Sequence, residues 1–128
     1  MNSSIINEIN RYSWADWFLD RFDIDFEKII VDISDYNDKP LRICCNDYIG
    51  FSFIGHWDES VIEEIIVESK GSLIDEALQT VKKLYGENPS PGGGVRKIHD
   101  TWYQMNMKLI DGNTIKIACK SIEIVTNL

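Results

Sequence analysis

The sequence lacks several features that would place it in a specialised class of protein. It has only three cysteines, Cys44, Cys45 and Cys119, and two of them are adjacent. An odd number with an adjacent pair is not typical of a secreted disulfide framework, so we expect reduced, packed thiols in a cytoplasmic protein. No run of about 18 apolar residues is present, so no transmembrane helix is expected. The first residues, MNSSIINEINRYSW, also lack the basic and apolar regions of a signal peptide.

Known catalytic and metal-binding patterns are missing as well. The chain has no Gly-x-Ser-x-Gly elbow and no Walker phosphate loop, and its cysteines lack the Cys-x-x-Cys spacing. His56 and Asp58 would supply two metal ligands at best, and a third would have to come from a distant segment such as His99 and Asp100. We therefore predict a protein that is not an enzyme and that uses no metal ion or cofactor.

What the sequence does contain indicates one acidic globular domain. With 128 residues, 44% hydrophobic and 27% charged, residues 1–128 are long enough to bury a core without disulfide or metal staples. The net charge is −8, and residues 1–69 hold 15 of the 21 acids but only 5 of the 13 bases. Such a charge repels nucleic acid and anionic membranes and attracts basic partners. The alternative is that the negative charge only keeps the protein soluble.

Periodicity of the apolar residues predicts an α+β fold. Helical spacing is found over 4–22, with a break near Ser13, and again over 72–85, while alternation typical of strands is found over 28–34, 41–45, 48–53, 101–110 and 114–124. The segment 61–68 fits either pattern, and we predict a strand because it is short and rich in β-branched residues. The predicted order is α-β-β-β-β-α-β-β, in a two-layer domain with a mostly antiparallel sheet and the helices on one face.

Local signals refine this prediction at four places. Gly50 within an apolar strand suggests that another element packs closely against it. Ser72 and Asp75 resemble a capping box at the start of the second helix, and Gly86 fits its end. A change of phase near Lys120 predicts a bulge or bend in the last strand. The segment Glu87 to Gly94, rich in proline and glycine, predicts a mobile loop within the domain.

The stretch from Tyr48 to Glu59, YIGFSFIGHWDE, carries the only likeness to a known group of proteins. A small, acidic α+β domain with this stretch resembles the small immunity proteins of bacterial polymorphic and contact-dependent toxin systems. The resemblance implies a protein that binds a toxin domain, often a basic nuclease, and blocks it. It assigns no role to individual residues.

The residues themselves suggest where such a partner would bind. A tryptophan beside acids is a suitable anchor, and an acidic face speeds association with a basic protein. The candidate contacts are Trp57, Asp58, Glu59, Glu63 and Glu64, with Asp16 and Asp20 as a second patch.

Three other interpretations remain open at the level of sequence. The segment 56–59 can be a simple turn in which Trp57 covers the end of the core. The chain can be a small enzyme or ligand-binding domain whose loop at 87–94 covers a pocket with His99, Asp100 and Trp102. It can also be a self-associating module that pairs through an exposed sheet edge.

Overall fold

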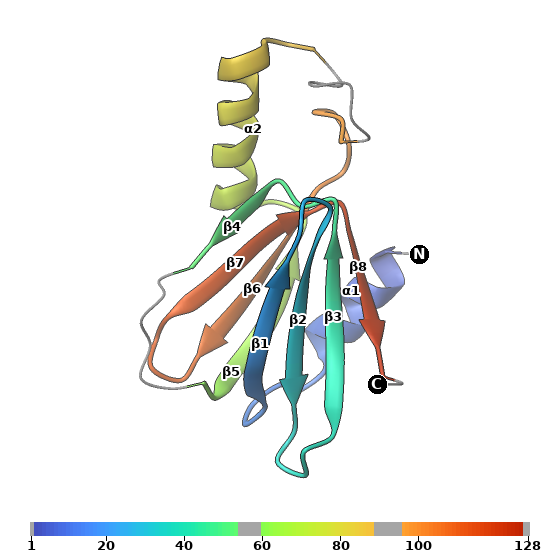
Figure 1. The fold of residues 1–128 in the computed structure, drawn as a ribbon, viewed down its shortest axis with the longest axis vertical. Coiled ribbons are helices and arrows are strands. Elements are labelled where there is room, and N and C mark those ends of the chain that lie inside the picture. Colours follow the sequence, from blue (N-terminus) through green and yellow to red (C-terminus); the bar gives the residue numbers. More distant parts are fainter. Residues whose placement is uncertain (1, 54–59, 89–95, 127–128) are drawn as a thin grey trace.

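The computed structural model describes residues 2–53, 60–88 and 96–126, and these form two helices and eight strands (Figure 1). The helices are α1 (Asn2–Arg11) and α2 (Ser72–Tyr85). The strands are β1 (Phe18–Ile24), β2 (Lys28–Ser34), β3 (Pro40–Asn46), β4 (Gly50–Ser52), β5 (Ile62–Glu68), β6 (Tyr103–Leu109), β7 (Thr114–Cys119) and β8 (Ser121–Val125).

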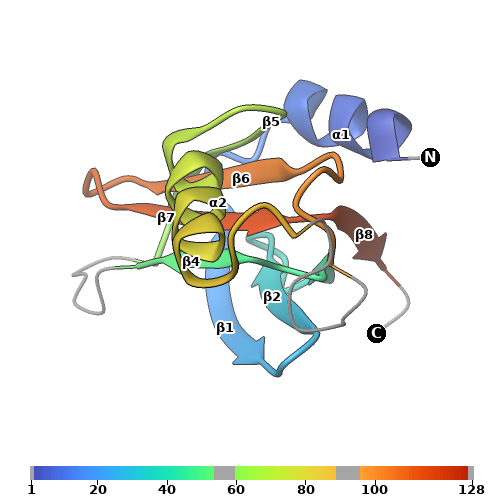
Figure 2. The same ribbon diagram turned by 90° about the horizontal axis from the view of Figure 1, so that it is seen from above.

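The strands form two four-stranded sheets. Sheet A has the order β1-β2-β3-β8 and sheet B has the order β4-β7-β6-β5, and neighbouring strands are antiparallel in both. The two sheets cross rather than lie parallel (Figures 1 and 2). They are joined at two corners. At one, β7 passes into β8 through Lys120; at the other, Phe18 forms a β-bridge with Val61.

The main core lies between the two sheets. Residues of both sheets point into it, and Ile29, Ile43, Met107 and Ile117 are fully buried there. Helix α1 packs against β5 and β8 and adds Ile9 to this core. The rings of Phe22, Phe51 and Phe53, which pack against the same core, lie 5.7–5.8 Å apart between centroids.

Helix α2 packs on the outer face of sheet B and forms a second, smaller core. Its first turn buries Leu73 and Ile74 against Trp102 and Ala118. A Cβ at Gly50 would lie 3.1 Å from the Leu73 side chain, so the close approach predicted at this glycine is confirmed. The far end of the helix extends beyond the sheets, and Leu84 and Tyr85 are exposed there (Figure 1).

The α+β class, the antiparallel pairing and the succession of strand runs between helices are confirmed by the structure. The strand over 61–68, the helix over 72–85 and the bend at Lys120 are also confirmed. The layers differ from the expectation in two respects. The strands form two sheets instead of one, and each helix packs at a different place, so the helices do not share one face.

The prediction of helix over 13–22 is wrong. The helix ends at Arg11, the chain turns at Asp16 with a φ of 70°, and strand β1 begins at Phe18. The register of β1 shifts between Leu19 and Arg21, which leaves Asp20 as an extra residue in a bulge. Leu19 and Phe22, three residues apart, therefore both face the core, and this spacing imitates a helix.

The capping box predicted for helix α2 is wrong as well. The N-cap residue is Gly71, and no side chain of the cap itself bonds to the helix. The backbone N–H groups of Leu73 and Ile74 instead donate to Oε1 of Gln104, which lies on strand β6. The predicted end of the helix is confirmed, because Gly86 has a φ of 70° and its N–H donates to the Lys82 carbonyl.

Candidate protein-binding surface

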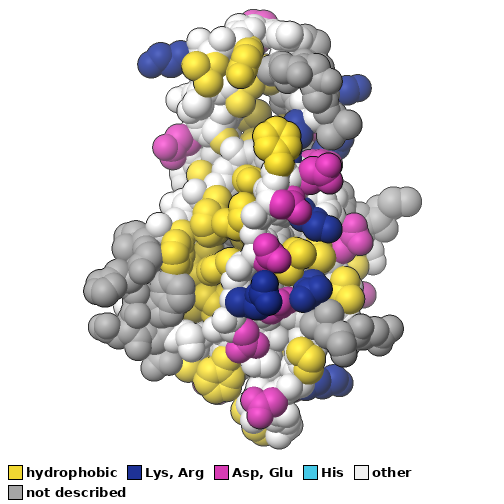
Figure 3. All heavy atoms as spheres, in the orientation of Figure 1, with side chains coloured by type: hydrophobic (Ala, Val, Ile, Leu, Met, Phe, Trp, Pro, Cys, Tyr) yellow, Lys and Arg dark blue, Asp and Glu magenta, His cyan; other side chains and the backbone are white. Residues whose placement is uncertain are grey.

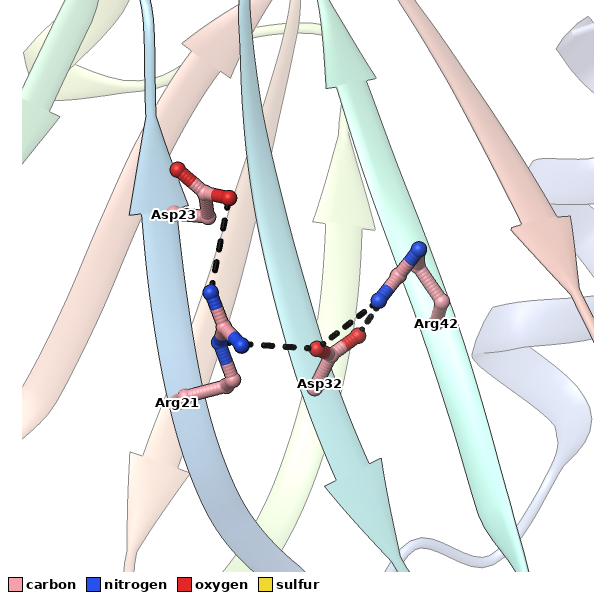
Figure 4. Close-up of polar contacts among 4 residues, drawn as sticks. All are labelled: Arg21, Asp23, Asp32 and Arg42. Carbon is pink, nitrogen blue, oxygen red and sulfur yellow. Dashed lines mark hydrogen bonds and ion pairs between the residues drawn. The ribbon is translucent and has the colours of Figure 1, made fainter. Parts of the chain in front are cut away.

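Many of the acids have partners within the fold, beginning with those on the outer face of sheet A. Asp32 accepts hydrogen bonds from Nε and Nη2 of Arg42 at 2.8 and 3.2 Å (Figure 4). Arg21 lies between Asp32 and Asp23, at 3.8 and 3.4 Å. Acidic and basic side chains are accordingly intermixed on the face that Figure 3 shows. The charges of Asp23 and Asp32 are therefore offset by arginines, so these two acids attract a basic partner less strongly.

A second group of acids shapes the turns between strands. Asp25 accepts the backbone N–H groups of Glu27 and Lys28, and these bonds, with that of Lys28 first, hold the pKa of the Asp25 carboxyl below its ordinary value. Asp35 and Asp111 accept backbone N–H groups in the same way within their own turns. These carboxylates have a structural role that accounts for their position.

A third group consists of exposed acids on the two segments that meet at the β1–β5 corner. The N–H of Asp16 donates to the Ile62 carbonyl at 3.0 Å, and the N–H of Ile62 donates to the Trp17 carbonyl at 2.7 Å. These bonds bring two segments 45 residues apart in sequence into contact. We call Asp16, Asp20, Glu63 and Glu64 the acidic edge; all four are exposed.

The acids of this edge are less neutralised than those on sheet A. Lys108 forms an ion pair with Glu63 at 3.1 Å, and that bond, aided by the nearby charges of Glu63 and Glu64, raises the pKa of the lysine. Within the described ranges, the carboxylates of Asp16 and Asp20 accept no hydrogen bond and form no ion pair. The edge therefore keeps a net negative charge.

The structure thus brings together four of the seven residues predicted from sequence. The two patches predicted from sequence lie on segments that contact each other at the β1–β5 corner. Trp57, Asp58 and Glu59 lie outside the described residues, as does His56. They precede Ser60 in the chain, and the Ser60 carbonyl accepts the N–H of Leu19 at 2.8 Å at this same corner.

Residues proposed for a pocket near 87–102 have structural roles where they are described. Trp102 is buried against helix α2 and donates its Nε1–H to the Ile98 carbonyl. Asp100 accepts the N–H of Lys97 and pairs with Lys120 at 3.2 Å. The guanidinium of Arg96 stacks on the rings of Phe26 and Tyr48, and it donates to the Phe26 carbonyl. Most of the loop predicted at 87–94 lies outside the described residues.

The described residues include an open pocket of about 380 Å³ that the sequence did not reveal. It lies where the end of helix α1 meets the β2–β3 turn, at the opposite end of the molecule from residues 96–102 (Figure 1). Three aromatic side chains line it: Tyr12, Trp14 and Trp17. The only sequence signal was the density of aromatic residues in RYSWADW, which we interpreted as a helical stripe.

The described part of the chain shows neither a metal-binding cluster nor a membrane-spanning helix. It contains no group of three or more His, Cys, Asp or Glu side chains arranged to hold a metal ion. None of its helices has the length and apolar character needed to cross a membrane.

Comparison with known proteins does not assign the chain to a group. No protein-family model, no curated protein and no solved structure matches it.

Proposed function

We propose that this chain is a non-catalytic binding protein of the immunity type, which binds a basic toxin domain and neutralises it. The observation that carries the proposal is the acidic edge, whose four exposed acids lie on two segments that backbone hydrogen bonds bring together at the β1–β5 corner. Several other acids of the fold are held by arginines or by turns, whereas all four of these residues are exposed and Glu63 pairs with Lys108. Exposed, concentrated charge is what an approaching partner encounters first.

We expect this edge to raise the association rate and the selectivity for a partner more than the affinity. Complementary charge steers a basic protein toward the correct face and raises its association rate. The same charge disfavours acidic or neutral competitors. An inhibitor that must meet its target before the target acts gains directly from fast association. Because exposed charges are screened over about 8–10 Å at ordinary ionic strength, this gain falls as salt is added.

The identification as an immunity protein rests on the likeness carried by Tyr48 to Glu59 and on the small, acidic character of the chain. Trp57, Asp58 and Glu59 belong to the proposed interface because they precede the acidic edge directly in the chain. Tryptophan at the centre of an interface is a frequent anchor. The proposed partner is a toxin domain, which we expect to be encoded by a neighbouring gene.

The test compares two variants that carry the same change in net charge. The edge variant combines Asp16→Asn, Asp20→Asn, Glu63→Gln and Glu64→Gln. The control variant combines Glu27→Gln, Asp75→Asn, Glu76→Gln and Glu87→Gln, all at exposed positions elsewhere. Stopped-flow mixing with the purified toxin domain measures the association rate, and a toxin activity assay measures neutralisation.

We expect the edge variant to associate about tenfold more slowly at low salt, since steering contributes factors of about 10–1,000. The control variant should stay close to the wild type, and added salt should reduce the difference between them. Equal rates for the two variants would exclude the acidic edge as the interface. A neighbouring gene without a toxin-like product, or a toxin domain whose activity this chain leaves unchanged, would overturn the immunity function itself.

A further inference from the structure

The pocket at the end of helix α1, which we call the aromatic pocket, has a wall of three rings. Tyr12 and Trp14 have ring centroids 4.6 Å apart, Trp14 and Trp17 5.2 Å, and Tyr12 and Trp17 6.0 Å. Trp14 is buried and its Nε1–H donates to the Ile9 carbonyl, so it contributes only its ring. Tyr12 is 55% exposed and Trp17 is half-buried. Solvent therefore reaches aromatic faces that are already fixed by their neighbours.

The charged groups at the pocket favour a cation. Glu8 and Asp35 lie in its lining against one lysine, Lys39. The Asp35 carboxylate is oriented by the backbone N–H groups of Asn37 and Lys39, at 2.9 and 3.0 Å, so it cannot turn away freely. The ring faces carry partial negative charge of their own, which attracts a cation placed over them.

The size and position of the pocket limit further which kind of ligand it can bind. At about 380 Å³ it is at the small end of ligand sites, which span about 300–1,000 Å³, so it suits one side chain better than a helix. Trp17 also belongs to the β1–β5 corner, because its carbonyl accepts the N–H of Ile62 beside the acidic edge. A partner on that edge therefore reaches the pocket without a change in the fold.

We propose that the aromatic pocket binds an arginine side chain of the basic partner protein, and this rests on the proposed function. A planar guanidinium stacks on aromatic rings and is less strongly hydrated than an ammonium group, and it bonds to carboxylates in two directions. Tyr12 and Trp17 supply the stacking faces, and Glu8 and Asp35 supply the charge. The arginine is the anchor, and the acidic edge guides the approach.

The direct test needs no identified partner. The probe is the capped tripeptide acetyl-Gly-Arg-Gly-amide, and its control is the same peptide with citrulline, which has nearly the same shape but no charge. Titration into ¹⁵N-labelled protein is followed by NMR through the side-chain N–H of Trp17. We expect weak, saturable shifts with the arginine peptide and at least tenfold weaker binding of the citrulline peptide.

Point variants assign the effect to the pocket. Tyr12→Ala and Glu8→Gln should each weaken binding about two- to fivefold, Tyr12→Phe should retain it, and Lys39→Met should strengthen it by removing a like charge. Glu76→Gln on helix α2 is the matched control and should have no effect. Equal binding of both peptides, no binding of either, or unchanged affinity in both Tyr12→Ala and Glu8→Gln would overturn the proposal.

The experiments distinguish a failure of the arginine pocket from a failure of the immunity function. If the arginine peptide binds but no toxin partner exists, the arginine-binding pocket is supported and the immunity function is excluded. If Tyr12→Ala leaves toxin neutralisation unchanged and no peptide binds, the immunity function is supported and the arginine anchor is excluded.

Discussion

Gln104 of strand β6 and Gly71 at the start of helix α2 fit each other closely. Oε1 of Gln104 accepts the N–H of Leu73 at 2.9 Å and the N–H of Ile74 at 3.3 Å. A Cβ at residue 71 would lie 2.2 Å from that same oxygen, so only glycine leaves room for it. Nε2 of Gln104 donates to Asn106, and Asn106 donates to Glu68. Hydrogen bonds that run from the helix through Gln104 and Asn106 to the Glu68 carboxylate thus attach helix α2 to sheet B.

Replacing Gln104 should destabilise the protein. Gln104→Leu leaves two buried N–H groups of the helix without an acceptor, which costs about 1–3 kcal/mol. Gln104→Glu should cost less, because a carboxylate still accepts both bonds and favours a helix N-terminus. Urea denaturation followed by circular dichroism measures both variants. A Gln104→Leu variant as stable as wild type would show that the cap does not contribute to stability.

The fit between the two residues also predicts how their substitutions combine. Gly71→Ala should destabilise the fold by roughly 1–3 kcal/mol, because the new methyl group overlaps Gln104. Gly50→Ala is the control, and it should cost less, because its Cβ would meet the end of the Leu73 side chain at 3.1 Å. In a double-mutant cycle, Gly71→Ala should cost less when Gln104 is already alanine. If the stability losses of the two substitutions simply add, the new methyl group does not clash with the Gln104 side chain.

Bulges explain why the sequence pattern was misread as a helix in β1 and was ambiguous in β5. Asp20 in β1 and Glu63 in β5 are each one extra residue in their strand, between register pairs. Each bulge places core residues three apart, Leu19 with Phe22 and Ile62 with Ile65, and period 3 is typical of helices. Strand β2, which pairs in regular register, was predicted with its exact bounds because its alternation is unbroken.

The candidate site was predictable in its chemistry but not in its assembly. Composition alone identified the acidic segments that hold Asp16 and Glu63. That they meet depends on a bridge between Phe18 and Val61, a contact over long sequence separation that no local pattern encodes. The aromatic pocket was missed for the same reason, since Asp35 and Ile124 reach it from distant segments.

The turn at Asp25 should make stability depend on pH in the acid range. Bonds from the N–H groups of Lys28 and Glu27 keep the folded-state pKa of this carboxyl below 3.8, the value in an unfolded chain. Its contribution to stability is therefore fully present above that pH and is lost as the pH falls through the folded-state pKa. Asp25→Asn should be less stable at neutral pH but should lose less on acidification. Urea midpoints measured from pH 6 to pH 2 test this, and parallel curves would contradict it.

The three cysteines should differ in reactivity. Cys45 and Cys119 are buried, and a hydrogen bond with the Cys119 thiol together with burial raises the pKa of Cys45 far above its ordinary value. Burial also raises the pKa of Cys44, but its side chain is partly exposed. Because the thiolate is the reactive form, iodoacetamide should label Cys44 first and the other two only after unfolding. Mass spectrometry of timed samples measures the order, and early labelling of Cys45 would contradict the packing.

The two bulges have a further consequence for how any partner binds. A strand from another protein extends a sheet only where the edge offers evenly spaced N–H and carbonyl groups. Asp20 and Glu63 interrupt that spacing on β1 and β5 where these strands meet, and they add charge at the same positions. The acidic edge is thus poorly suited to strand addition, by a toxin domain or by another copy of this chain. A partner there has to be recognised through side chains, and the fold is protected from stacking on itself at that corner.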